Sequence, residues 1–129
     1  MGPGFFRRPK DLIDVSHTPS EARPFFVLGA QRSGTTMLRL MLNNHPRLAV
    51  PHETVFITQF FRKLPQYGDL AQAENMRRLL DEIAAHTLVV RGELIPDKDA
   101  VLARQPRTYA ELIDAIMTCY AEARGKARW

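Results

Sequence analysis

The chain has 129 residues, of which 45% are hydrophobic and 25% are charged, and its formal net charge is +4. This balance is typical of a globular protein with about one domain, and it excludes the fibrous and the disordered classes. The positive charges are scattered and are not interleaved with aromatic residues, so nucleic acid is not an expected partner. A single cysteine, Cys119, excludes an intrachain disulfide and a cysteine-based metal cluster.

The first 24 residues contain prolines and early glycines without hydrophobic periodicity. We therefore expect a flexible tail over residues 1–24, followed by one domain over residues 25–129. No apolar run approaches the roughly 20 residues that a membrane-spanning helix needs. The N-terminus also lacks the charged region and apolar stretch of a signal peptide, so the sequence predicts a cytoplasmic protein.

The apolar run Phe25–Leu28 leads into Gly29, a polar loop, Gly34 and two threonines, Thr35 and Thr36. This order predicts a buried strand that feeds a helix N-terminus through a phosphate-binding turn. The glycines allow a tight turn, and the first turn of a helix offers unpaired N–H groups and a positive dipole end to an anion. The spacing G-x-x-x-x-G is that of a Walker A loop, but Thr35 stands where an ATPase carries its Lys.

The cation of this loop is Arg32, whose guanidinium can hold two oxygens of a phosphate or of a transferring group. We expect the phosphate end of a ligand to be bound by Gly29, Arg32, Ser33, Gly34, Thr35 and Thr36. The residues alone leave two alternatives open. One is a nucleotide kinase or ATPase-like protein without the Walker A lysine, and the other is a non-enzymatic helical interaction module.

The order R-S-G-T-T before M-L-R-L-M-L-x-x-H-P resembles the loop of the P-loop sulfotransferases. These enzymes use it to bind the 5′-phosphosulfate end of 3′-phosphoadenosine 5′-phosphosulfate. The form with Arg is most similar to the tyrosylprotein sulfotransferases and their bacterial relatives. The segment P-H-E-T at Pro51–Thr54 resembles the G-E-E-T segment that holds their catalytic Glu. The resemblance therefore implies Arg32 and Glu53 as catalytic residues, a sulfated nucleotide as co-substrate and no metal.

The tyrosylprotein enzymes carry an Arg after E-T that helps to hold the substrate, whereas this chain has Val55. The resemblance therefore does not carry over peptide-tyrosine specificity. The acceptor hydroxyl can belong to a small molecule, a carbohydrate or a peptide.

The resemblance also implies a three-layer α/β/α fold with a parallel sheet. Leu48–Val50 would be a second strand that delivers His52 and Glu53 to the edge at which open α/β sheets bind ligands. Between the two strands we expect a helix with Arg39 on the side opposite to its apolar face, and with His45 capping its end. That apolar face comprises Met37, Leu38, Met41 and Leu42.

Beyond the second strand the pattern is helical. Helices are expected over Val55–Leu64, over Leu70–Leu88, briefly over residues 100–104, and from Thr108 to Gly125, with a turn-rich connector over Val89–Asp99. In the first of these, Phe56, Phe60 and Phe61 should face inward or line the acceptor pocket. The last should begin with a capping box of Thr108 and Glu111 and present an apolar stripe of Tyr109, Leu112, Ile113, Ile116, Met117 and Tyr120.

In related sulfotransferases a run similar to K-A-R-W, here Lys126–Trp129, leads into a Lys-Thr-Pro segment and further strands that bind the 3′-phosphate. The resemblance therefore implies that the chain covers the N-terminal portion of a sulfotransferase domain. Two strands are too few for a sheet covered on both faces, so we expect a mostly helical chain that is inactive by itself.

Overall fold

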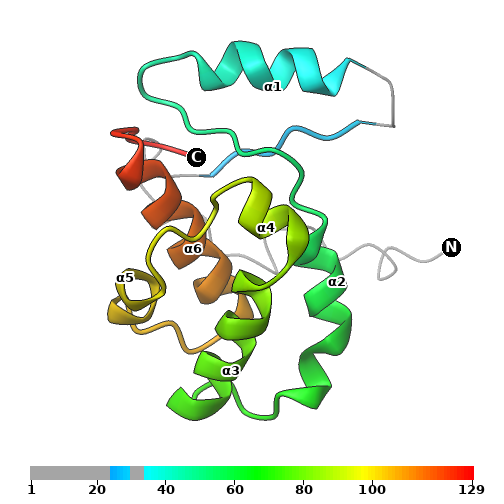
Figure 1. Cartoon of the computed structure of the whole chain (residues 1–129), viewed down its shortest axis with the longest axis vertical. Coiled ribbons are helices and arrows are strands. Elements are labelled where there is room, and N and C mark those ends of the chain that lie inside the picture. Colours follow the sequence, from blue (N-terminus) through cyan, green and yellow to red (C-terminus); the bar gives the residue numbers. More distant parts are fainter. Residues whose placement is uncertain (1–23, 30–33) are drawn as a thin grey trace, which may run out of the picture.

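A computed structural model describes residues 24–29 and 34–129 of the chain. Within them, helices α2 to α6 pack into a helical body, and α1 lies apart from it beside the extended segment 24–29 (Figure 1). The helices are α1 (Thr35–Asn43), α2 (Phe56–Lys63), the 3-10 helix η3 (Leu64–Gln66), α3 (Ala73–Ala84), α4 (Thr87–Arg91), α5 (Lys98–Ala103) and α6 (Tyr109–Ala123). The tail predicted over residues 1–24 lies, except for Pro24, outside the described residues.

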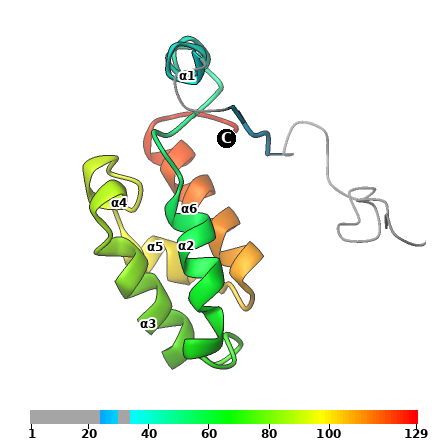
Figure 2. The same cartoon turned by 90° about the vertical axis from the view of Figure 1, so that its right-hand side faces the viewer.

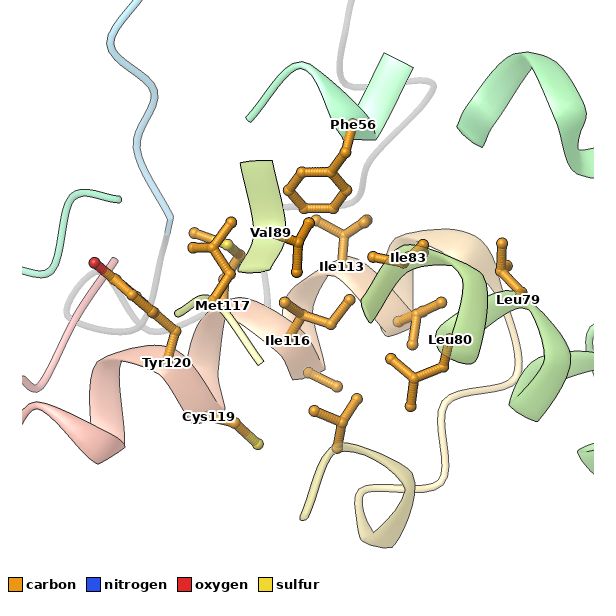
Figure 3. Close-up of a cluster of buried hydrophobic side chains, with 14 of the residues drawn as sticks. Phe56, Leu79, Leu80, Ile83, Val89, Ile113, Ile116, Met117, Cys119 and Tyr120 are labelled. Atoms are coloured by element: carbon orange, nitrogen blue, oxygen red, sulfur yellow. The ribbon is translucent and has the colours of Figure 1, made fainter. Parts of the chain in front are cut away.

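The core of the helical body forms around α6, which buries residues along most of its length. Side chains of α6 such as Ile113 and Ile116 pack against Phe56 of α2 and against Leu80 and Ile83 of α3 (Figure 3). Fully burying an aliphatic side chain of this size stabilises a fold by about 1.5–3 kcal/mol. The apolar stripe predicted for this helix is confirmed by the buried residues Leu112, Ile113, Ile116, Met117 and Tyr120.

Both ends of α6 carry the predicted caps. The Thr108 hydroxyl accepts a hydrogen bond from the Glu111 N–H at 3.2 Å, while the Glu111 carboxylate accepts from the Arg107 N–H at 2.7 Å. At the other end Gly125 has φ +66°, and the N–H groups of Gly125 and Lys126 donate to carbonyls of the last turn of α6. This is the pattern of a Schellman motif, in which a glycine takes the left-handed position after the helix.

The helix predicted over Val55–Leu64 is confirmed as α2, but one of its three phenylalanines does not face inward. Phe56 and Phe60 are four residues apart, share a helix face and are buried. Phe61 is rotated about 100° from Phe60 around the helix, and it is 63% exposed. Its ring instead lies beside that of Tyr109, with 6.1 Å between the ring centroids.

The single helix predicted over Leu70–Leu88 is wrong in its extent, because α3 ends at Ala84 and a separate α4 begins at Thr87. The His86 ring Nδ1 accepts a hydrogen bond from the Leu88 N–H at 3.3 Å, so His86 acts as the N-cap of a new helix. Helix α4 therefore enters the region predicted as a connector. The short helix predicted over residues 100–104 corresponds to α5, which begins two residues earlier.

Three extended segments meet beneath α1. The Ala49 N–H donates to the Arg128 carbonyl at 2.8 Å, and the Phe25 N–H donates to the Trp129 carbonyl at 3.3 Å. The end of the chain thus lies between the two segments that were predicted as strands. The Ala49 contact, together with the Arg128 N–H that donates to the Arg47 carbonyl at 3.0 Å, forms one isolated parallel bridge, Leu48 with Arg128. No β-strand is assigned in the described ranges. The described structure is therefore mostly helical, and the expected parallel sheet is limited to these pairings.

Helix α1 departs most from the prediction. Of its predicted apolar face, Met37, Leu38 and Met41 are 69%, 46% and 65% exposed. Viewed along its axis, α1 stands clear of the helical body (Figure 2). Periodicity defines which side of a helix is apolar, but burial also requires a facing surface, and the described segments place none against these three residues. No helix of the described segments is both long and apolar enough to cross a membrane.

Candidate functional site

The N-terminus of α1 is open to a ligand. Gly34 is the N-cap with φ +86° and ψ 7°, a left-handed conformation that glycine adopts at little cost. The first helical hydrogen bond runs from the Leu38 N–H to the Gly34 carbonyl at 3.1 Å. No side chain caps this end of the helix in the described structure. Within the described residues, the N–H groups of the first turn therefore have no side-chain acceptor and lie at the positive end of the helix dipole.

A polar crevice of about 170 Å³ lies at this helix end. It brings Thr35 and Thr36 of α1 together with Glu53. The other lining residues are Val27, Arg39, Pro51, His52 and Thr54. Gly29 is described and exposed but does not line the crevice. Arg32 and Ser33 lie outside the described residues.

The segment that carries Glu53 is fixed by the residues before it. Ala49 and Val50 are buried, and both of their N–H groups are hydrogen-bonded, to the Arg128 carbonyl and to the Asn43 side chain respectively. The chain then leaves the interior at Pro51, and α2 begins at Phe56. Glu53 therefore sits on a short exposed link between two anchored elements.

Arg39 and His52 are among the crevice residues that were not predicted as site residues. Arg39 was expected on the far side of α1, but it is half-buried and lines the crevice, with Nη1 3.5 Å from the Val50 carbonyl oxygen. Its spacing of four residues from Thr35 places both on one helix face, which is a signal that the sequence contained. His52 lines the crevice directly before Glu53. His45 does not line it. The cap predicted at His45 is wrong by one residue, because Asn44 is the C-cap of α1, and the His45 Nδ1 accepts from the Arg47 N–H at 3.1 Å.

An apolar cavity of about 120 Å³ adjoins the crevice and shares Val27, Pro51, His52 and Thr54 with it. Its other lining residues include Phe26, Leu28, Ile57, Met117 and Trp129. The crevice therefore has polar walls at the end of α1 and apolar walls toward α2 and α6.

Other reactive groups lie away from this site. Cys119 is buried in the core, and burial raises the pKa of its thiol, which disfavours the thiolate that a nucleophile needs. The described segments contain no group of three or more His, Cys, Asp or Glu residues placed to hold a metal ion.

Comparison with known proteins adds one finding. The model of the Sulfotransferase family matches residues 24–129. Neither a curated protein nor a solved structure matches the chain. The matched region contains residues 29–36, which were predicted to bind a phosphate, Glu53 and the whole helical body. The chain therefore belongs to the sulfotransferase family.

Proposed function

We propose that this protein transfers a sulfuryl group from 3′-phosphoadenosine 5′-phosphosulfate to an acceptor hydroxyl. The observation that carries the proposal is the 170 Å³ crevice, in which the hydroxyl-bearing first turn of α1 adjoins the Glu53 carboxylate. One wall offers hydrogen-bond donors to an anion, and the other offers a base to a hydroxyl. Family membership supports sulfuryl transfer as the reaction that uses both walls.

The donor nucleotide would be held by its 5′-phosphosulfate end. The N–H groups at the start of α1 and the hydroxyls of Thr35 and Thr36 suit phosphate oxygens, as does the helix dipole. Gly29, Ser33 and Gly34 would let the loop follow the phosphate closely. The Arg32 guanidinium would contact the bridging oxygen and the sulfuryl oxygens as they gain charge.

In the transfer step, the Glu53 carboxylate would accept the proton of the acceptor hydroxyl. The acceptor oxygen attacks the sulfur atom, and the bond from sulfur to the bridging oxygen of the 5′-phosphate breaks. The electron pair of that bond leaves with the phosphate, so the products are a sulfate ester and 3′-phosphoadenosine 5′-phosphate. Arg32 and the loop N–H groups would stabilise the charge on the leaving oxygen, so the proposed step uses no metal.

The acceptor is proposed as a hydroxyl of a small molecule, a carbohydrate or a peptide. The apolar cavity beside Glu53 offers space for the group that bears this hydroxyl. A cytoplasmic location remains a prediction from the sequence.

The test is Glu53→Gln in the full-length protein, assayed by transfer of labelled sulfate from the donor nucleotide to a panel of hydroxyl acceptors. Glutamine keeps the shape of the side chain but is not a base, so turnover should fall by about 100- to 10,000-fold. Affinity for 3′-phosphoadenosine 5′-phosphate should stay within about three-fold, because the donor contacts lie on α1 and its loop.

Glu74→Gln is the matched control, since Glu74 is an exposed carboxylate in the first turn of α3, and it should leave turnover unchanged. Unchanged turnover in Glu53→Gln with weaker donor binding would assign Glu53 a structural role. A parent protein that transfers sulfate to none of the acceptors and binds no donor nucleotide would refute the proposed function.

A further inference from the structure

Asn43, the last residue of α1, joins this helix to two other parts of the chain. Its side-chain Oδ1 accepts a hydrogen bond from the Val50 N–H at 3.0 Å. Its backbone carbonyl accepts one from the Lys126 Nζ at 2.9 Å, and the same Nζ donates to the His45 carbonyl at 2.6 Å. Helix α1 begins at the phosphate-binding loop, and Val50 lies three residues before Glu53. Asn43 therefore links the element that carries the donor loop to the element that carries the proposed base.

This link matters because packing does not hold α1. The helix has no buried residue, and most of its apolar side chains are exposed. Val50, by contrast, is only 8% exposed, so its peptide groups depend on protein partners. Asn43 accepts from the Val50 N–H, and Arg39, one turn earlier on the same face, approaches the Val50 carbonyl at 3.5 Å. Within the described ranges, polar contacts to one residue thus fix α1 against the Glu53 segment.

The length of α1 amplifies any displacement of its end. From Asn43 to Thr35 the helix extends roughly 12 Å, at about 1.5 Å per residue. A tilt of about 5° at Asn43 therefore moves the donor-binding turn by about 1 Å, and a misplacement of that size can slow a reaction by about 100-fold.

We propose that Asn43 is a positioning residue for sulfuryl transfer, which acts through its hydrogen bond to Val50 and sets the distance between the first turn of α1 and Glu53. The inference rests on the proposed function of that crevice. Lys126 would help to position the same end of the helix, because its ammonium group donates hydrogen bonds to the carbonyls of Asn43 and His45.

The test compares Asn43→Ala with Asn43→Asp in the full-length protein. Alanine removes the acceptor and is the better helix former, so α1 itself should persist. Turnover should fall by about 10- to 100-fold, while affinity for 3′-phosphoadenosine 5′-phosphate stays within about three-fold because the donor contacts are local to the loop. Aspartate keeps an acceptor oxygen at the same position and should restore turnover to within about three-fold of the parent.

Asn44→Ala is the matched control. Asn44 is exposed at the C-cap of α1, and its side chain makes no hydrogen bond to any residue that the structure describes. This change should leave turnover as it is. If Asn43→Ala loses its cooperative thermal transition, Asn43→Gln takes its place, since glutamine moves the acceptor outward by one methylene group and should also lower turnover.

Amide hydrogen exchange at Val50 provides a readout that does not depend on activity. The Val50 N–H should be protected in the parent, in Asn43→Asp and in Asn44→Ala, and it should exchange faster in Asn43→Ala. Unchanged exchange at Val50, or unchanged turnover of Asn43→Ala in an active parent, would overturn the positioning role. A parent without sulfuryl transfer would instead overturn the proposed function, and the exchange at Val50 would still report whether the link exists.

Discussion

Replacing Gly34 by alanine tests the donor loop through its backbone. Gly34 has φ +86°, and a Cβ atom at this position would meet no atom of the described residues within 4 Å, its chain neighbours apart. Among the described residues the substitution therefore introduces no steric clash, and its cost is the left-handed conformation, about 1–2 kcal/mol for a residue with a side chain. The site offers an uncommonly clean separation of backbone strain from packing.

The strain should appear in donor affinity. A free loop can relax away from the left-handed conformation, whereas a loop that holds a phosphate with its N–H groups cannot. Binding of 3′-phosphoadenosine 5′-phosphate would then carry the cost of about 1–2 kcal/mol, which corresponds to an affinity about 5- to 30-fold lower. Titration calorimetry on the full-length protein measures this change directly.

Gly68→Ala is the control for this experiment. Gly68 also has a positive φ, +74°, but it follows η3 at the far end of the helical body, where an added Cβ would approach only the Asn75 side chain, at 3.3 Å. It should lower the melting temperature without changing donor affinity. The reasoning is refuted if Gly34→Ala binds the nucleotide within about two-fold of the parent, or if Gly68→Ala loses as much affinity.

Two further changes test the loop cation and the core. Arg32→Ala should lower turnover by about 100- to 1000-fold, or roughly 3–4 kcal/mol of transition-state stabilisation, and turnover within a few-fold of the parent would exclude the assigned role. Tyr109 donates to the Ile57 carbonyl at 2.6 Å, and burial raises the pKa of Tyr109 to about 12. Unfolded tyrosine ionises near pH 10, so this side chain contributes constant stability below about pH 10 and loses it as the pH rises toward 12. Tyr109→Phe should therefore cost about 1 kcal/mol at pH 8 but close to nothing at pH 11 in urea unfolding, and an equal cost at both pH values would contradict this account.

Local signals predicted much of the helical body. The start and end of α6 follow from Thr108, Glu111 and Gly125, because each cap is a hydrogen-bond pattern within a few residues. The break between α3 and α4 was missed because its cap is an unusual residue. Histidine is not among the preferred N-cap residues, so no sequence pattern indicated a helix start at His86, yet the His86 ring supplies the acceptor for the Leu88 N–H.

Of the predicted site residues, Thr35, Thr36 and Glu53 line one crevice in the structure. The loop that leads to Thr35 follows the apolar run Phe25–Leu28, and Glu53 follows Leu48–Val50 by three residues. Loops that follow parallel strands are expected at one edge of a sheet. Arg39 was missed because it was placed only by its position opposite the apolar residues of the helix, and not by its spacing from Thr35. The structure leaves those residues exposed and turns the Thr35, Arg39 and Asn43 face toward the Glu53 segment. Contacts that join residues far apart in sequence, such as Lys126 with Asn43, carry no local pattern and could not be predicted.

The position of Trp129 lets its intrinsic fluorescence report on one contact of the fold. It is the single tryptophan of the sequence. Its indole Nε1 donates to the Thr118 hydroxyl of α6 at 3.2 Å, and its ring meets the edge of Phe26 with 6.3 Å between centroids. Indole emission therefore originates where the segment that leads into the donor loop meets the helical body. Detachment of that segment should change the fluorescence while the far-ultraviolet circular dichroism of α2 to α6 stays constant, so the two signals together resolve whether the loop region and the helical body separate in one step or in two.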